Sequence, residues 1–499
     1  MEQNGSSYVP MNLFTTKQED GLQEAVKEGR VIVIPWNRKT YLTLPEIREK
    51  EAFCAREIVA RAKITDTLGK AEPEVIEGLI KNYEEENRIR FSDEQRTGIE
   101  MICNSHFCIL TGGPGTGKTS VLKCAAMVIG RTAGRRCTMD FTSPTGKAAK
   151  RITESSGFDA STLQSYTGGF GGTSIKLKAP DVLFVDESSM VDLDTLHAML
   201  ECLMPITKIV LVGDTEQLPS VGIGSVLRDL IDCGAVRFTQ LVKTFRQDES
   251  STLFENIQNV KNGGSTPLKN GSDFNFIQED DDAKIKERCI AAYLESVKLF
   301  GLSETAVLTP YRKKGDLCSD VLNRELQALV NPTGKSFKAL VRRDDYTLEV
   351  TYRIGDPVIQ LVNHKGLANG EVGTVTDVSD GKVTVRFSDR NMTYWKKDLD
   401  SLDLAYALSI HKSQGSEYKS VVMPVSKSHR NLSRNLIYTG LSRAKKFCTV
   451  VGSFEVIRDA CEKQADLERG TFLVEEIQNQ LYQVALKMAI VKQHDWTKN

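Results

Sequence analysis

A glycine-rich turn between an apolar strand and a helix constrains the fold of this chain more than any other feature. Residues 112–119 have the sequence Gly-Gly-Pro-Gly-Thr-Gly-Lys-Thr, which contains the pattern G-x-x-x-x-G-K-[ST]. The apolar run 108–111 precedes it, and a helical pattern over 120–128 follows it. Glycines at this spacing let the backbone curl so that several N–H groups face one anion. The sequence therefore predicts a phosphate-binding loop in an α/β domain, with these residues around a nucleotide: Gly113, Pro114, Gly115, Thr116, Gly117, Lys118, Thr119 and Ser120.

Two further groups of residues complete a predicted hydrolytic site. Lys118 is expected to reach the β- and γ-phosphates, and Thr119 to hold Mg²⁺ through its hydroxyl. The apolar run 182–185 ends in two acids, of which Asp186 would bind Mg²⁺ and Glu187 would polarise the attacking water. These motifs indicate ATP or GTP hydrolysis. A signalling GTPase is disfavoured because no Asn-Lys-x-Asp guanine motif is present, and a small nucleotide kinase would not need several hundred further residues.

Short apolar strands alternate with helical segments in two series, which is typical of mostly parallel sheets covered by helices. The first series begins near residue 91, and the second near residue 238. We therefore expect an α/β chain of four parts: an N-terminal domain over 1–90, two α/β domains over 91–236 and 237–455, and a helical tail over 456–499.

Three smaller β elements are also expected. In the N-terminal part, 31–36 and 41–44 flank a possible hairpin turn. Residues 168–178 contain four glycines and predict a β-hairpin inserted in the first α/β domain. Residues 352–402 are dense in short β-rich pieces separated by glycines, which predicts a small antiparallel barrel inserted in the second.

Charge and cysteine content exclude several classes of protein. Sixty-five basic and 66 acidic residues give a net charge of −1, so nonspecific wrapping of duplex is not expected, although a local groove could still bind nucleic acid. The 11 cysteines are scattered without zinc or iron–sulfur spacing, which favours free thiols in a reducing, intracellular setting. No apolar run approaches the about 20 residues that cross a bilayer, and the N-terminus lacks a signal-peptide pattern. A cytoplasmic protein without a membrane segment is expected.

Three more polar residues stand in distinctive strings. Gln217, after the apolar run 209–213, is placed to sense the γ-phosphate. Arg246 lies in Thr-Phe-Arg-Gln over 244–247, and Arg443 lies in the string 438–445. An arginine from one α/β unit can complete the ATP site of its neighbour and neutralise charge in the transition state. A surface ion pair remains the alternative for either arginine taken singly.

The ordered set of strings resembles the superfamily 1 DNA helicases of the RecD-like, 5′→3′ branch, over roughly residues 30–455. The strings that carry this resemblance are 91–95, 111–120, 142–149, 184–191, 211–224, 244–247, 404–418 and 438–445. The resemblance implies two RecA-like domains around one ATP, with single-stranded DNA across their top. It also implies a pin hairpin at about 166–180 and an SH3-like barrel at about 366–400.

The resemblance assigns roles to individual residues. It implies that Gln95 recognises adenine, that Gly415 and Glu417 lie near the nucleotide, and that Arg443 is the arginine finger. Gln164 stands where the family usually carries histidine, so its DNA contact is expected to differ. The residues expected along the DNA path, including the one aromatic of the pin, are Thr142, Pro144, Thr145, Gln164, Phe170, Ser409, His411 and Lys412.

The combined expectation is a monomeric, ATP- and Mg²⁺-dependent DNA helicase that moves 5′→3′ on single-stranded DNA. It would act at junctions of single- and double-stranded DNA in repair, recombination or replication, with a single-strand-binding, repair or replication protein as a candidate partner. Two alternatives stay open: a translocase that strips proteins from single strands, and an ATP-switched subunit of a larger repair complex. An RNA helicase is a weaker alternative, since no residue clearly recognises a 2′-hydroxyl.

Overall fold

The chain folds as two compact units. In the computed structural model, the first unit comprises Met1–Pro144, Ala149–Phe245 and Ala465–Asn499, and the second comprises Thr145–Ala148 and Arg246–Gln464. No helix in the part of the chain that the structure describes has the length and apolar content to span a bilayer. The residues described are 5–14, 16–36, 38–64, 68, 71–168, 177–245, 251–313, 315–343, 346–364, 367–379, 381–388, 390–463 and 469–496, excluding the side chains of 16–19 and 488–496.

The first unit is built on a six-stranded parallel sheet in the order β6-β5-β7-β8-β4-β9. The central strand register places Ile109 opposite Leu211 on one side and Phe238 on the other. The predicted apolar runs 182–185 and 209–213 are parallel strands of the same sheet as the phosphate-loop strand, as expected. The strands are β4 (Phe107–Gly112), β5 (Met139–Ser143), β6 (Ala160–Thr162), β7 (Val182–Val185), β8 (Lys208–Gly213) and β9 (Arg237–Leu241).

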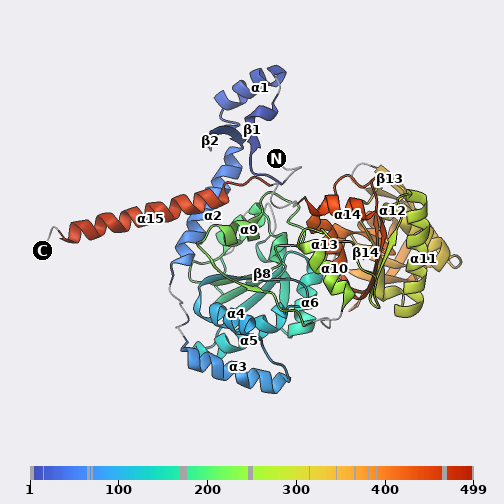
Figure 1. Ribbon diagram of the computed structural model, residues 1–499, viewed down its shortest axis with the longest axis horizontal. Helices are drawn as coiled ribbons and strands as arrows, with labels where there is room; N and C mark the ends of the chain where they lie inside the picture. The colour runs from blue at the N-terminus through green and yellow to red at the C-terminus, as the bar shows by residue number, and fades with distance from the viewer. Residues whose placement is uncertain are drawn as a thin grey trace. The chain divides into compact units, whose positions relative to one another are not determined.

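Helices cover both faces of this sheet because successive apolar residues of each strand point to opposite sides. Ile109 joins a core with α2, α7, α8, α9 and α15, whereas Leu110 joins a core with α3, α4, α5 and α6. Figure 1 shows α4 and α5 on one side of β8 and α9 on the other. The helices are α2 (Pro45–Ala62), α3 (Pro73–Asn87), α4 (Asp93–Asn104), α5 (Lys118–Thr132), α6 (Gly146–Ser156), α7 (Leu163–Tyr166), α8 (Leu193–Cys202), α9 (Val226–Asp232) and α15 (Leu473–Trp496).

Both ends of the chain belong to the first unit. The predicted N-terminal hairpin is confirmed as β2 (Ile32–Trp36) paired with β3 (Lys39–Thr43), and β1 (Val9–Pro10) adds to the other edge of β3. A short 3-10 helix, Met11–Leu13, and α1 (Thr16–Lys27) accompany this sheet. The C-terminal helix α15 packs against α2, and Figure 1 shows the start of α15 beside α2 and the rest of the helix pointing away from it.

The second unit is built on a parallel sheet in the order β10-β21-β20-β11-β19. Helix α11 packs on β20 and β11 and buries Ile285, Cys289 and Tyr293 there, whereas α13 packs against α10 and α14. The elements are β10 (Phe274–Gln278), β11 (Thr305–Thr309), β19 (Ala407–Ser409), β20 (Tyr418–Val425), β21 (Ala444–Gly452), α10 (Thr252–Lys261), α11 (Asp282–Phe300), α12 (Ser319–Val330), α13 (Arg434–Ser442) and α14 (Phe454–Cys461).

An antiparallel β region is inserted between β11 and β19. Its five-stranded sheet has the order β17-β16-β15-β14-β18. A separate hairpin, β12 (Ser336–Arg343) with β13 (Tyr346–Arg353), precedes it and was not expected from the sequence. The inserted strands match the expectation, while closure into an SH3-like barrel remains a prediction. They are β14 (Pro357–Gln360), β15 (Val372–Ser379), β16 (Lys382–Arg386), β17 (Asn391–Trp395) and β18 (Leu402–Leu404).

The expected boundary between the two α/β domains is wrong by about ten residues. The sequence placed the start of the second domain at residue 237, but β9 pairs with β4, and the units divide after Phe245. The tail expected over 456–499 is also divided, because α14 lies in the second unit and α15 in the first. The predicted pin hairpin lies outside the described residues over 169–176.

Candidate nucleotide and nucleic-acid sites

Three neighbouring strands bring the predicted nucleotide residues to one edge of the first sheet. The phosphate loop follows β4, Gln217 follows β8, and Asp186 follows β7, with β8 between the other two. Because parallel strands end at the same edge, the three segments converge there. The structure therefore unites residues that are about 100 positions apart in the chain.

The phosphate loop takes the shape that its glycines allow. Gly115 and Gly117 have φ angles of 77° and 82°, which L side chains rarely adopt. The Thr116 hydroxyl donates to the Gly113 carbonyl at 2.8 Å. Lys118 Nζ donates to the carbonyls of Gly112 at 2.7 Å and Gly113 at 3.0 Å, so its ammonium lies over the loop. This places a cation and the N-terminus of α5 where phosphates would bind.

The Gln95 side chain stabilises the phosphate loop by a hydrogen bond. Its side chain is buried, with Oε1 accepting from the Ser92 backbone N–H and Nε2 donating to the Thr116 carbonyl, both at 2.9 Å. A Cβ on Gly117 would lie 2.4 Å from that Nε2, and the φ of 82° independently favours glycine at this position. Sequence reasoning missed this hydrogen bond, although the Ser-x-x-Gln spacing is a capping-box signal. Recognition of adenine by Gln95 remains a prediction.

Asp186 and Glu187 form the acidic end of the site. The Asp186 N–H donates to the Thr142 carbonyl, and its Oδ1 accepts from the Glu187 N–H at 2.8 Å. Burial raises the pKa of Asp186, and the Glu187 charge raises it further, while Lys118 opposes the shift. A carboxylate here and the exposed hydroxyl of Thr119 are oxygen ligands of the kind that Mg²⁺ accepts.

Gln217 and the segment after β9 complete this edge. Gln217 is buried, and its Nε2 lies 3.3 Å from Oδ2 of Asp214. The Phe245 N–H donates to the Gly115 carbonyl at 2.8 Å, so the predicted Thr-Phe-Arg-Gln string begins on the phosphate loop. Arg246 itself lies outside the described residues.

The second unit holds its candidate residues differently. Arg443 is 3% exposed, and its guanidinium donates to the Thr439 carbonyl at 3.2 Å and the Ser416 carbonyl at 3.4 Å. Gly415 has a φ of 72°, and Glu417 forms an ion pair with Lys445 at 2.8 Å. Arg443 therefore closes the loop that contains Gly415 and Glu417.

The candidate DNA residues of the first unit differ in accessibility. Thr142 is fully buried, and its hydroxyl donates to the Phe184 carbonyl at 3.1 Å, so this hydroxyl is committed to the sheet. Pro144 is half-buried, and Gln164 is exposed on α7. Phe170 lies outside the described residues.

Thr145 belongs to the second unit and is also half-buried. Its hydroxyl accepts from the Ala148 N–H at 3.3 Å, which fixes it at the start of α6.

In the second unit, the candidate DNA residues follow β19. Ser409 is buried and His411 is exposed. The pKa of Lys412 is lowered to about 8, first by burial and then by the charges of Arg312 and Arg343. These two arginines were missed, although Arg312 begins a basic string over 312–314 shortly after the strand β11; Arg343 ends β12 and stands in no such string.

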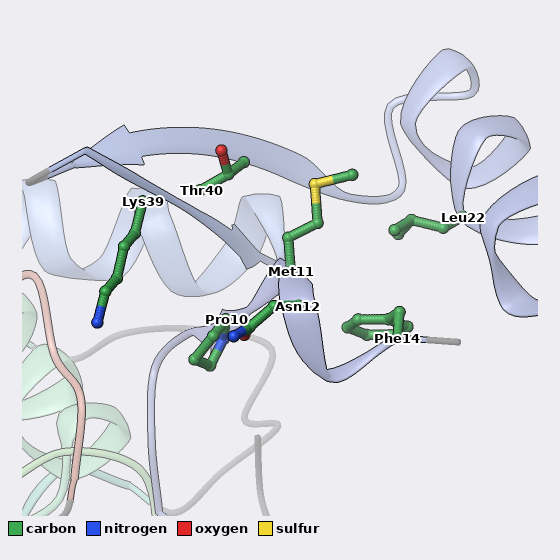
Figure 2. A pocket seen from close by; sticks show the side chains of 7 residues that line it. All are labelled: Pro10, Met11, Asn12, Phe14, Leu22, Lys39 and Thr40. Atoms are coloured by element: carbon green, nitrogen blue, oxygen red, sulfur yellow. The ribbon is translucent and has the colours of Figure 1, made fainter. Parts of the chain in front are cut away.

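A hollow in the N-terminal sheet lies outside the predicted motifs. It has a volume of about 410 Å³, and Figure 2 shows Met11, Phe14 and Leu22 around it, with Lys39 to the side. Its lining carries one basic and no acidic side chain, which suits neither Mg²⁺ nor proton transfer. Across the described ranges, no three His, Cys, Asp or Glu side chains are grouped as metal ligands, and all eleven cysteines are free thiols.

Two family models match the chain. Residues 90–282 match the AAA domain, and residues 404–451 match the UvrD-like helicase C-terminal domain. The first match spans the phosphate loop, Asp186 and Gln217, and the second spans Lys412 and Arg443.

Curated relatives align over most of the chain. The ATP-dependent RecD2 DNA helicase of Deinococcus radiodurans is 32% identical over 77% of this chain, but the chain spans about half, 52%, of that protein. The RecBCD enzyme subunit RecD of Mycolicibacterium smegmatis is 31% identical over 75% of this chain and 73% of its own length. A solved structure of Pif1 helicases at forked double-stranded DNA aligns with a TM-score of 0.48 at 21% identity, covering 74% of this chain and 94% of that one. On the match to RecD over most of both lengths, the chain belongs to the RecD-like family of superfamily 1 DNA helicases.

Proposed function

We propose that this chain is an ATP- and Mg²⁺-dependent DNA helicase that moves 5′→3′ on single-stranded DNA and separates the duplex ahead of it. The observation that carries the proposal is the convergence of Lys118, Asp186 and Gln217 at one sheet edge in a chain of the RecD-like family. That set contains a phosphate-binding cation, an acid for Mg²⁺ and a γ-phosphate sensor. Arg443 and Arg246 would supply positive charge to the transition state.

The DNA would be gripped by polar and basic groups that do not distinguish bases. Lys412 and His411 suit this role, since phosphate contacts position a strand without carrying sequence information. Gln164 and Thr145 are further candidate DNA contacts, and Phe170 would act in the pin. The 5′→3′ direction, the RecA-like domains and the SH3-like barrel rest on the family resemblance, as does a role in repair, recombination or replication.

A second candidate is an ATP-switched subunit of a larger repair complex. One observation favours it: the Mycolicibacterium smegmatis relative is named as a subunit of the RecBCD enzyme. Such a subunit would hydrolyse ATP on single-stranded DNA but would not separate strands by itself. A single-strand-binding, repair or replication protein would then supply the missing part.

Strand displacement from two duplexes, one with a 5′ tail and one with a 3′ tail, tests the proposal. With ATP and Mg²⁺, we expect displacement from the 5′-tailed duplex only, and none with the Lys118→Ala variant. Strand displacement from the 3′-tailed duplex would overturn the proposed 5′→3′ direction of movement. ATPase stimulated by single strands with no displacement from either duplex would overturn the autonomous helicase and favour the subunit. No ATP hydrolysis at all would overturn the whole assignment.

A further inference from the structure

The loop after Gln217 is held by a side chain from the far end of the sequence. Residues 218–225 connect Gln217 to α9 without regular structure. One guanidinium nitrogen of Arg469, Nη1, lies 3.0 Å from the Gly222 carbonyl, 3.1 Å from the Gly224 carbonyl and 3.3 Å from the Ser220 hydroxyl. A single cation therefore gathers three oxygens within five residues of the loop.

The N-terminal segment holds the same loop from another side. The Gly224 N–H donates to the Gly5 carbonyl at 2.8 Å. Gly5 has a φ of 64°, and a Cβ there would lie 2.6 Å from the central guanidinium carbon of Arg469. Any side chain at residue 5, even the methyl group of alanine, would therefore displace the Arg469 guanidinium.

The segment that carries Arg469 is itself firmly attached to the first unit. The Gly470 carbonyl accepts from the Ser7 N–H at 2.8 Å, and the Phe472 N–H donates to Oε1 of Glu51 at 2.9 Å. The Thr471 hydroxyl donates to Oδ2 of Asp229 on α9 at 3.0 Å. These bonds anchor residues 469–472 to the N-terminal segment, α2 and α9, so Arg469 is presented from a fixed support.

We propose that Arg469 is a positioning residue for ATP turnover: it fixes the loop 218–225 and thereby the placement of Gln217 at the nucleotide edge. The inference rests on the proposed function for the role of Gln217. The loop begins directly after Gln217, whose amide is otherwise placed by Asp214. Loss of three bonds to a cation would let the loop move, and small displacements of a catalytic group lower turnover strongly. The hydrogen bonds from Lys118 Nζ and the Thr116 hydroxyl to carbonyls lie within the phosphate loop, so nucleotide binding should persist.

Kinetics of the full chain test this role. For Arg469→Ala we expect kcat of the single-strand-stimulated ATPase to fall about tenfold, with KM for ATP changed by less than about twofold. Arg469→Lys should recover part of kcat, because an ammonium can donate to the same carbonyls. Arg458→Ala is the matched control, since that half-exposed arginine pairs with the adjacent Asp459 on α14. A raised KM with unchanged kcat in Arg469→Ala, or wild-type values for both, would overturn the inference.

Gly5→Ala and hydrogen exchange give tests that do not depend on turnover. We expect amides of 218–225 to exchange faster in both Arg469→Ala and Gly5→Ala than in the wild type, with Arg458→Ala unchanged. Unchanged exchange in both variants would overturn the proposal that Arg469 fixes the loop 218–225, even if Arg469→Ala were too unstable for kinetics. Failure of the proposed function is seen separately, as absent ATPase in the wild type or full ATPase in Lys118→Ala.

Discussion

The nucleotide edge of the first unit and the Arg443 loop of the second unit use charged side chains in opposite ways. At the nucleotide edge, Lys118 Nζ donates to two carbonyls of its own loop, and Thr119 is exposed. In the second unit, Arg443 is 3% exposed and donates to carbonyls from two segments. At the nucleotide edge, the candidate side chains contribute little to the stability of the fold. In the second unit, the candidate arginine also stabilises its own loop. Substitutions should therefore lower turnover alone in the first region, but both turnover and stability in the second.

The largest expected effect is on Lys118. Lys118→Ala should lower ATP turnover by at least about 1,000-fold, because it removes the cation that we propose at the β- and γ-phosphates. Its thermal unfolding midpoint should stay within about 2 °C of the wild type, since Lys118 is only partly buried and substitutions away from a packed core change stability little. Steady-state ATPase and thermal unfolding measured on the same sample check this. A folded variant with full turnover would contradict the assignment of Lys118 to the ATP site. A large loss of stability would contradict the contrast between Lys118 and Arg443.

Arg443 should show both effects at once. Arg443→Ala should lower turnover about 100-fold if it is the arginine finger. It should also lower the unfolding midpoint by several degrees, because buried carbonyls lose hydrogen bonds worth about 1–3 kcal/mol. Arg443→Lys keeps the charge but not the planar set of donors, so it should recover some stability and little turnover. An unchanged unfolding midpoint would show that the buried bonds contribute nothing, and the contrast with Lys118 would disappear.

Strands with a clear local pattern could be predicted from the sequence. Features that depend on contacts between distant residues could not. The buried strands β4, β7 and β8 were predictable because each is a continuous apolar run between turn signals. Strand β9 was assigned to the wrong domain because only Leu241 of its five residues is buried, so its pattern says nothing about its partner.

Some missed features did leave a signal, and others left none. The hairpin β12–β13 alternates exposed and buried residues and could have been found by its period of two. Arg469 could not, since its partner Ser220 lies 249 positions away and no motif surrounds it. The contact that joins them exists only in the folded chain.

Lys412 in the second unit is a further case of a candidate functional cation that is also largely buried. Burial first, and then the charges of Arg312 and Arg343, together lower the pKa of Lys412 to about 8, while Asp403 and Asp320 oppose the shift. Asp403 also pairs with both arginines, at 3.3 and 3.4 Å. The Lys412 ammonium is therefore charged below about pH 8 and increasingly neutral above it.

The smallest expected effect follows from that titration. If Lys412 grips a DNA phosphate, the affinity for single-stranded DNA should fall about three- to tenfold between pH 7 and pH 9 at low salt, because one charge-assisted contact is lost as the ammonium deprotonates. Lys412→Ala should bind at pH 7 as weakly as the wild type does at pH 9, with a flat pH profile. Lys419→Ala removes a partly exposed lysine of the same unit, which pairs with Glu304, and should keep the wild-type slope. Fluorescence anisotropy with a labelled single strand measures all three. A wild-type slope in Lys412→Ala would remove this lysine from the DNA path and assign its lowered pKa to packing within the second unit.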